Sequence, residues 1–444
     1  MSSLATGPTA GRAAGSPRKI ASLALPALVV LAAEPLYVLV DTAVVGHLGS
    51  VPLAALAVSG TVLTMAAWMG TLLAYGTTSR AARRFGAGDR GAAVQEGMQA
   101  SWVAFAAGVL IIVGIQLGAD PLARALAGGA TDVAASAASW LRIASLGAPG
   151  LLLSAAGNGW MRGVQDTRRP LVYVLGANLL SAVLCPVLVY PAGLGLTGSA
   201  VANACAQTAA GMLFARALLV EGVPRRPRPA VILRQLGAGR DLLVRGLAFQ
   251  ASFLSATAVA ARFGTATVAA HQVALQLWFF TQLMLDAVAI AAQSLVGAAL
   301  GAGAADEARR LARRIALIGG VCGVAFAVLV AAGSGVLPGL FSADPAVLEQ
   351  AAVAWPWFVG MQPVAGVVFA LDGVMIGAGD IGFLRNLTLV SALGVFLPAI
   401  WTAYALDLGL GGIWAGLTLF VAVRLVGLVW RLRSGRWAVV GAVR

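Results

Sequence analysis

The chain has 444 residues, of which 60% are hydrophobic and only 11% are charged, and its mean hydropathy is +0.89. A soluble domain carries roughly 25% charged residues, so this chain has too little polar surface for a water-soluble globule. Its net charge of +13 comes from arginines in short connections between apolar runs, which excludes a basic nucleic-acid-binding face. The composition indicates a polytopic helical membrane protein.

Apolar segments recur along the chain, each near the length of about 20 residues that crosses a bilayer core. Glycine and proline are frequent inside them, as is usual for membrane helices. The pattern predicts twelve transmembrane helices. In chain order these are residues 20–46, 51–78, 95–118, 137–160, 171–191, 196–219, 242–262, 267–299, 314–338, 350–376, 386–406 and 410–431.

Basic residues concentrate at the two termini and in every second connection. The N-terminus contributes Arg12, Arg18 and Lys19, and Arg444 ends the chain. The apolar run that follows Lys19 is too long for a signal peptide, so we expect an uncleaved first span. Basic loops stay cytoplasmic, which predicts a multi-pass protein of the cell (inner) membrane with both termini inside the cell.

The two halves of the chain repeat at an offset of about 215 residues. "VDTAVVGHLGSVPLAALAV" (40–58) aligns with "SATAVAARFGTATVAAHQV" (255–273), and "GNGWMRGVQD" (157–166) aligns with "LDGVMIGAGD" (371–380) at an offset of 214. Internal repeats of this kind are frequent in transporters. Each repeat holds six spans, an even number, so both halves start on the same side of the membrane.

The predicted fold is therefore an all-α integral membrane protein with two six-helix lobes. The N-terminal lobe comprises residues 1–220 with helices 1–6, a cytoplasmic linker covers residues 221–240, and the C-terminal lobe comprises residues 241–444 with helices 7–12. A pseudo-twofold axis along the membrane normal would relate the lobes. Rocking of two such lobes gives alternating access to a cleft between them.

Asp41 lies inside the first span, where a charge costs from about 3 to more than 10 kcal/mol. Its repeat partner is Ala256, although the next three residues of each repeat are identical. Folding of a lobe therefore does not require an acid at this position, and we expect Asp41 to carry a function. The alternative is a structural aspartate that bonds the neighbouring backbone.

Other polar side chains within the spans are candidates for lining a substrate cavity. Glu34 precedes Pro35, which breaks the helical hydrogen-bond ladder, so Glu34 could bind a substrate cation or satisfy the kink. Asp372 has Asn158 as its repeat partner, so both lobes place a polar group there. Each candidate could instead form an interhelical hydrogen bond. The remaining candidates are Tyr37, Asn178, Ser181, Asn203, Gln207 and Asp286.

The cysteines and histidines give no sign of a metal site or a disulfide framework. Cys185, Cys205 and Cys322 lie in apolar segments without a C-x-x-C pair, and His47 and His271 are the only histidines. We expect neither a metal ion nor a cofactor. A membrane-embedded enzyme would need a clustered catalytic motif, and the sequence has none, so we expect no enzymatic activity.

Four blocks together resemble the multidrug and toxic compound extrusion (MATE) family in its DinF-like branch: "EPLYVLVDTAVVGHLG", "FGAGD", "RGVQDTRRP" and "LDGVMIGAGD". The resemblance covers nearly the whole chain and implies twelve helices in two lobes. It also implies export of organic, often cationic, compounds against inward movement of protons or sodium. The family's coupling residue on the first helix matches Asp41.

The chain departs from the family pattern on the fifth helix. There the family usually has an asparagine and, four residues later, an aspartate before a proline, whereas this chain has Ser181 and Cys185 before Pro186. Sodium needs several hard oxygen ligands, so the departure favours a proton as the coupling ion. Asp372 resembles a tenth-helix aspartate of the family, but the seventh-helix glutamate that some branches pair with it is absent. Helix 7 has only Asp241.

The predicted function is a monomeric secondary active antiporter that exports organic compounds, cationic or amphiphilic, in exchange for protons. Its expected partners are a small-molecule substrate and the lipid bilayer. The alternatives are an exporter of metabolites or organic acids and a lipid-intermediate flippase of a related fold. A flippase for pyrophosphate head groups should hold basic residues inside the lobes. The spans look nearly free of Arg and Lys, which favours a cationic or neutral substrate.

Overall fold

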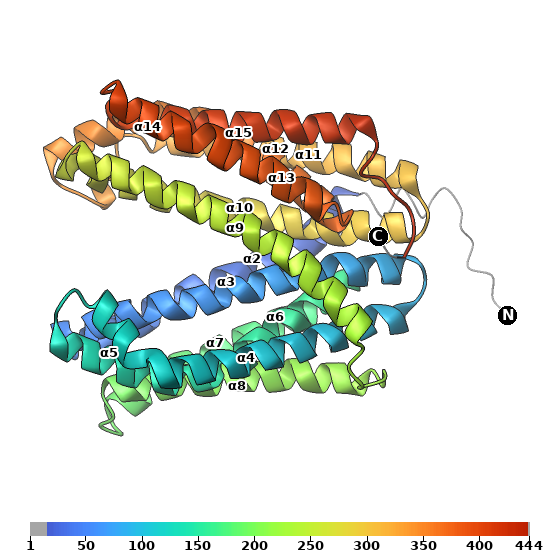
Figure 1. Ribbon diagram of the computed structural model, residues 1–444, viewed down its shortest axis with the longest axis horizontal. Coiled ribbons are helices and arrows are strands. Elements are labelled where there is room, and N and C mark those ends of the chain that lie inside the picture. The colour runs from blue at the N-terminus through green and yellow to red at the C-terminus, as the bar shows by residue number, and fades with distance from the viewer. Residues whose placement is uncertain (1–15, 443–444) are drawn as a thin grey trace. The chain divides into compact units, whose positions relative to one another are not determined.

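The computed structural model describes residues 16–442, so Arg12 and Arg444, used to predict the orientation, lie outside the described residues. Throughout this range the chain forms helices joined by short connections, without a strand (Figure 1). The helices are α2 (Pro17–Gly46), α3 (Ser50–Gly86), α4 (Arg90–Leu126), α5 (Thr131–Ala144), α6 (Ala148–Gly163), α7 (Arg168–Val189), α8 (Leu196–Val220), α9 (Pro229–Arg262), α10 (Thr265–Gly301), α11 (Ala305–Ala332), α12 (Pro345–Gly377), α13 (Ile381–Ser391), α14 (Leu397–Ala405) and α15 (Gly409–Ser434).

These helices provide the twelve predicted spans. Two spans are interrupted: a 3-10 turn, Ser145–Gly147, separates α5 from α6, and a π-helical turn, Ala392–Phe396, separates α13 from α14. Ten helical segments of the described chain are long and apolar enough to cross a membrane. The α5–α6 segment and the more polar α8 complete the twelve.

Several helices extend beyond the predicted apolar runs. Helix α3, the second described helix, continues past residue 78 through Arg83 and Arg84 to Gly86. The reason is that backbone hydrogen bonding continues into water, whereas hydropathy reports only the length inside the lipid. Likewise α9 begins at Pro229, inside the predicted linker, because proline suits the first turn of a helix.

The described chain divides into two compact units. The N-terminal unit comprises residues 25–237, and the C-terminal unit comprises the residues from Ala238 onward together with the described residues up to Ala24. Both boundaries fall inside a helix, one in α2 and one in α9. The first turns of α9 therefore belong to the N-terminal unit.

The helix boundaries repeat at the offset found in the sequence. Helices α3 and α10 each have 37 residues and begin at Ser50 and Thr265. Each follows a glycine with positive φ: +118° at Gly49 and +119° at Gly264. Other residues are strained in that region, so the two turns require the same residue for the same backbone reason. The units share one internal plan.

Small residues allow the central helices of each unit to pack backbone against backbone. In the N-terminal unit, a Cβ added to Gly163 on α6 would lie 2.5 Å from Ala81 Cβ on α3. In the C-terminal unit, a Cβ at Gly377 on α12 would lie 2.6 Å from the Gln293 carbonyl oxygen on α10. Close approach through small residues is the usual way for membrane helices to associate.

The connection between α8 and α9 is bound to α4. The Gln99 side chain donates to the Arg226 carbonyl oxygen over 3.1 Å and accepts from the Arg228 backbone N–H over 2.6 Å. Trp102 Nε1 donates to the Arg225 carbonyl oxygen over 2.8 Å. This part of the predicted linker is therefore a fixed element of the N-terminal unit.

Candidate functional site

Asp41 lies at the meeting point of three helices of the N-terminal unit. Its side chain projects from α2, and the residue is only 5% exposed. Ser199 Oγ on α8 donates to Asp41 Oδ1 over 2.7 Å, and Cys185 Sγ on α7 donates to the same oxygen over 3.1 Å. Hydrogen bonds to an ionised acceptor are stronger than neutral ones, so this pair of donors can hold the carboxylate in its charged form. The second oxygen accepts no bond from the described residues.

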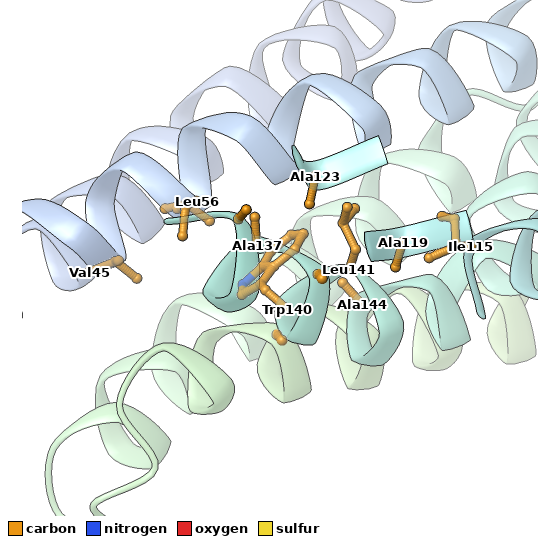
Figure 2. Close-up of a cluster of buried hydrophobic side chains, with 13 residues drawn as sticks. Val45, Leu56, Ile115, Ala119, Ala123, Ala137, Trp140, Leu141 and Ala144 are labelled. Atoms are coloured by element: carbon orange, nitrogen blue, oxygen red, sulfur yellow. The ribbon is translucent and has the colours of Figure 1, made fainter. Parts of the chain in front are cut away.

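Trp140 on α5 fixes the position of Ser199. The indole Nε1 donates to Ser199 Oγ over 3.2 Å, so a chain of hydrogen bonds runs from Trp140 through Ser199 to Asp41. The Trp140 ring is 3% exposed and lies in a cluster of buried apolar side chains that includes Leu56 and Ala144 (Figure 2). A closely packed ring has little freedom, so the hydroxyl that it orients has little freedom either.

Tyr37 and Asn203 form a second polar pair one turn of α2 before Asp41. Asn203 Nδ2 on α8 donates to the Tyr37 hydroxyl over 3.1 Å. Ser181 is buried on α7 beside the same hydroxyl. The structure therefore brings together Tyr37, Ser181 and Asn203, three of the candidates from the sequence, around the coupling candidate.

The described residues of the N-terminal unit enclose at least two cavities. The larger has a volume of about 160 Å³, and the smaller has about 120 Å³. Asp41 lines the smaller cavity, together with Thr64 and Asn203. Asn158 and Asn178 line the larger one, and Asn158 Nδ2 donates to the Ser154 carbonyl oxygen over 3.0 Å. Both volumes can hold several waters or one polar group of a ligand.

Glu34 connects the two cavities, because it lines both, as do Tyr37 and Gln207. Glu34, Tyr37 and Asp41 are spaced at i, i+3 and i+7, which puts them on one face of α2. Pro35 has no N–H, so the Leu31 carbonyl loses its helical partner, and Leu31 also lines the larger cavity. The polar face of α2 is thus the shared wall of both cavities.

The C-terminal unit contains a buried charge cluster. The Asp372 carboxylate on α12 accepts from Arg245 on α9 and from Arg424 on α15, both through Oδ2. Asp372 and Arg424 are each 4% exposed. The Phe249 ring lies against both guanidinium groups, whose Cζ atoms are 5.4 and 5.0 Å from its centroid.

This cluster corrects the expectation that the spans are nearly free of Arg and Lys. Two buried arginines face one carboxylate, so Asp372 does not offer a bare negative charge to a substrate. The prediction that the spans are nearly free of Arg and Lys passed over both arginines, although Arg245 lies inside the predicted span 242–262 and Arg424 inside the predicted span 410–431. In the structure, α9 and α15 both extend beyond these runs, which places Arg245 and Arg424 well inside the helices.

The other acidic residues of the C-terminal unit have different surroundings. Asp286 lies half-buried on α10. Asp241, near the predicted start of helix 7, lies 2.8 Å from Arg385 Nη1 in an ion pair. Asp380, which precedes α13, forms a two-point pair with Arg431, with distances of 2.7 and 3.1 Å.

The structure places four residues at these sites that were not among the candidates from the sequence: Ser199, Trp140, Arg245 and Arg424. Ser199 follows two glycines at the start of α8 and looks like part of a turn. Its repeat partner is the apolar Ile413, just as the repeat partner of Asp41 is the apolar Ala256. Comparison of the two repeats could therefore have identified Ser199 as a candidate. A tryptophan in a membrane span suggests an interface anchor, and only tertiary contact reveals the role of Trp140.

Known proteins resemble this chain in sequence over most of its length. The MatE family model matches residues 26–187 and 242–402. Over 434 residues the chain is 33% identical to Protein DETOXIFICATION 44, chloroplastic, of Arabidopsis thaliana, covering 94% of this chain and 83% of that protein. Over 430 residues it is 31% identical to DNA damage-inducible protein F of Escherichia coli (strain K12), covering 94% of this chain and 92% of that protein.

Solved structures agree with the fold. A crystal structure of MATE in the bent conformation has a TM-score of 0.88 at 21% identity, with 97% of this chain and 99% of that chain covered. An outward-facing multidrug resistance MATE family transporter of the MOP superfamily has a TM-score of 0.80 at 23% identity, with 94% and 96% covered. The family match spans both repeats, and the chain belongs to the MatE family of multidrug and toxic compound efflux transporters, which are membrane transporters and not enzymes.

Proposed function

We propose that this protein is a secondary active exporter of organic compounds that exchanges them for protons, with Asp41 as the proton carrier. The observation that supports the proposal is the position of Asp41: buried, at the wall of a cavity, and bonded by two donors through one oxygen. The other oxygen can take up or release a proton through the cavity. The two donors satisfy the charged form, so ionisation does not leave a bare charge in the membrane.

The groups around Asp41 favour a proton over sodium. Ser199 and Cys185 point hydrogens at the carboxylate, and Ser199 also accepts the Trp140 N–H. A sodium site would need several oxygen lone pairs directed at one point. Thiol sulfur is a soft ligand and suits sodium poorly. One titratable group with two donors is sufficient for a proton.

The N-terminal cavities suit the basic or amphiphilic part of a substrate. Glu34 and Asp41 supply carboxylates, and Tyr37 and Tyr75 supply aromatic surface. Aromatic faces and carboxylates both attract organic cations. Protonation of Asp41 would weaken this attraction, which gives a simple rule for exchange: the proton and a cationic group compete for one site.

The remaining steps follow the family fold. Two lobes that alternate between inward and outward access would carry the substrate out and protons in. We further propose that both termini are cytoplasmic and that the working unit is a monomer.

The test is transport by purified protein in proteoliposomes under an imposed pH gradient or an imposed sodium gradient. A fluorescent organic cation such as ethidium serves as the probe. We expect the pH gradient to drive transport and Asp41→Asn to reduce it to background, because the amide cannot ionise. Asp344→Asn is the matched control, since Asp344 is an exposed helix cap on α12. Transport that follows only the sodium gradient would exclude the proposal.

A further inference from the structure

We propose that Arg245 and Arg424 form a binding subsite for the acidic group of an organic anion, and that Asp372 occupies this subsite as a built-in competitor. The substrates then include organic compounds with a carboxylate or sulfonate. The subsite belongs to the C-terminal unit alone. The role of this subsite in export rests on the proposed function, whereas the binding of an anion to the subsite does not.

The first observation is the charge balance. Arg245, Asp372 and Arg424 carry a net charge of one positive, with side chains that are 12%, 6% and 5% exposed. An uncompensated charge is costly at such depth in a membrane protein, and buried groups of this kind usually mark a substrate pathway. A single carboxylate does not neutralise two guanidinium groups.

The second observation is incomplete hydrogen bonding. Both arginines use the same Asp372 oxygen, Oδ2. Among the residues that the structure describes, the other oxygen, Oδ1, and the Nε groups of Arg245 and Arg424 are buried without a partner. A carboxylate can accept about four hydrogen bonds, and a guanidinium normally presents two parallel donors to it. The cluster therefore retains donors for a second acidic group.

A structural ion pair in the same unit shows the difference. Arg431 holds Asp380 through two separate bonds, Nε to Oδ2 over 2.7 Å and Nη2 to Oδ1 over 3.1 Å. Both carboxylate oxygens are used there. The contrast indicates that the geometry at Asp372 is a feature of that site and not the general way in which this unit pairs its buried charges.

The third observation comes from the repeat. Arg245, Asp372 and Arg424 correspond to Val30, Asn158 and Ala210, which all line the larger cavity of the N-terminal unit. At the matching place in the C-terminal unit, three charged side chains fill the space that small residues leave open in the other. The charge cluster therefore stands at the place that corresponds to the larger cavity of the N-terminal unit.

The aromatic rings of the cluster define the ligand class further. Phe249 lies against both guanidinium groups, and the Arg424 Cζ atom is 5.6 Å from the Phe420 ring centroid. Rings in this position keep the guanidinium planes fixed and offer apolar surface next to the charge. An acidic group on an aromatic or alkyl body fits this combination better than a hydrated inorganic anion.

The test is equilibrium binding to the purified full-length protein in detergent without any ion gradient. The probe is radiolabelled benzenesulfonate, which is always ionised, and benzenesulfonamide is its neutral counterpart. We expect the wild type to bind the anion about tenfold more tightly than the neutral compound. Arg245→Gln and Arg424→Gln should each remove most of that preference, since each takes away one guanidinium.

Asp372→Asn distinguishes a binding site from a merely structural ion cluster. Loss of the competing carboxylate should tighten anion binding by about tenfold. The control is Arg262→Gln, which alters another α9 arginine that lies over the Trp401 and Tyr404 rings, outside the cluster. It should bind the probe as the wild type does.

Equal binding of the two compounds by the wild type would overturn the inference, as would an unchanged affinity in folded Asp372→Asn. If Asp372→Asn does not fold, the wild type and the two arginine variants decide the question. Asp41→Asn should bind benzenesulfonate normally while it loses proton-driven transport. Failure of the anion subsite and failure of proton coupling are therefore separate results.

Discussion

Ser199 Oγ lies 2.7 Å from Asp41 Oδ1, although 158 residues separate the two in the chain. The hydroxyl donates to the carboxylate and accepts from Trp140, so its orientation is set from both sides. At the matching positions of the second repeat stand Ile413 and Ala256, which can form no such bond. The acid and its donor are therefore present together in one unit and absent together from the other.

Removal of this hydroxyl should change the pH dependence of transport. A hydrogen bond to a charged group contributes about 1.5–3 kcal/mol. Because Ser199 donates to the ionised carboxylate, Ser199→Ala favours protonated Asp41, and we expect the pH–rate profile to move toward higher pH with a lower maximum. Proteoliposome flux across a pH series measures this. Ser101→Ala, which loses only an intrahelical bond, should keep the wild-type profile.

The departure of this chain from the family pattern on the fifth helix, at Ser181 and Cys185, predicts how the preference for a coupling ion can be changed. Combined Ser181→Asn and Cys185→Asp would restore an amide and a carboxylate near Asp41, and so supply the hard oxygen ligands that sodium requires. We expect transport by this variant to be stimulated by an inward sodium gradient, unlike the wild type. Cys185→Ser keeps a donor and should remain proton-driven. If a sodium gradient did not stimulate transport by the double variant, the identity of these two residues would not explain the choice of coupling ion.

Backbone contact between α3 and α6 should make Gly163 sensitive to substitution. A Cβ there would lie 2.5 Å from Ala81 Cβ and 2.9 Å from the Ala82 backbone nitrogen. Overpacking of this kind costs about 1–3 kcal/mol, so Gly163→Ala should lower the melting temperature in detergent. A Cβ at Gly114 on α4 would meet no atom of the described residues within 4 Å, so Gly114→Ala should leave the melting temperature unchanged or slightly raised. Equal melting temperatures for the two variants would contradict the contact.

The Asp380–Arg431 pair should behave as a structural element. Loss of one partner from a buried ion pair costs about 3–5 kcal/mol, because the other charge stays buried. We expect Asp380→Asn to lower the melting temperature clearly, and addition of Arg431→Gln to restore part of it. A double-mutant cycle of melting temperatures measures the coupling. Purely additive losses would show that the two side chains do not depend on each other.

The sequence by itself determined the class of protein, the number of spans and the repeat. Apolar length, basic connections and an offset near 215 suffice for these, because lipid leaves a chain few ways to satisfy its backbone. It also singled out Asp41, since an acid in an apolar span with an alanine repeat partner has few structural explanations. Glu34, Tyr37, Ser181 and Asn203 followed as polar residues in the same spans.

Tertiary structure decided which of these groups meet. The hydrogen bonds of Ser199 and Cys185 to Asp41 join three helices, and no local pattern encodes such contacts. The pairing of Asp372 with Arg245 and Arg424 reversed the charge expected at that place, because hydropathy treats each helix alone. The energy of a buried charge depends on the charges and donors within a few ångströms, and those come from helices far apart in the chain.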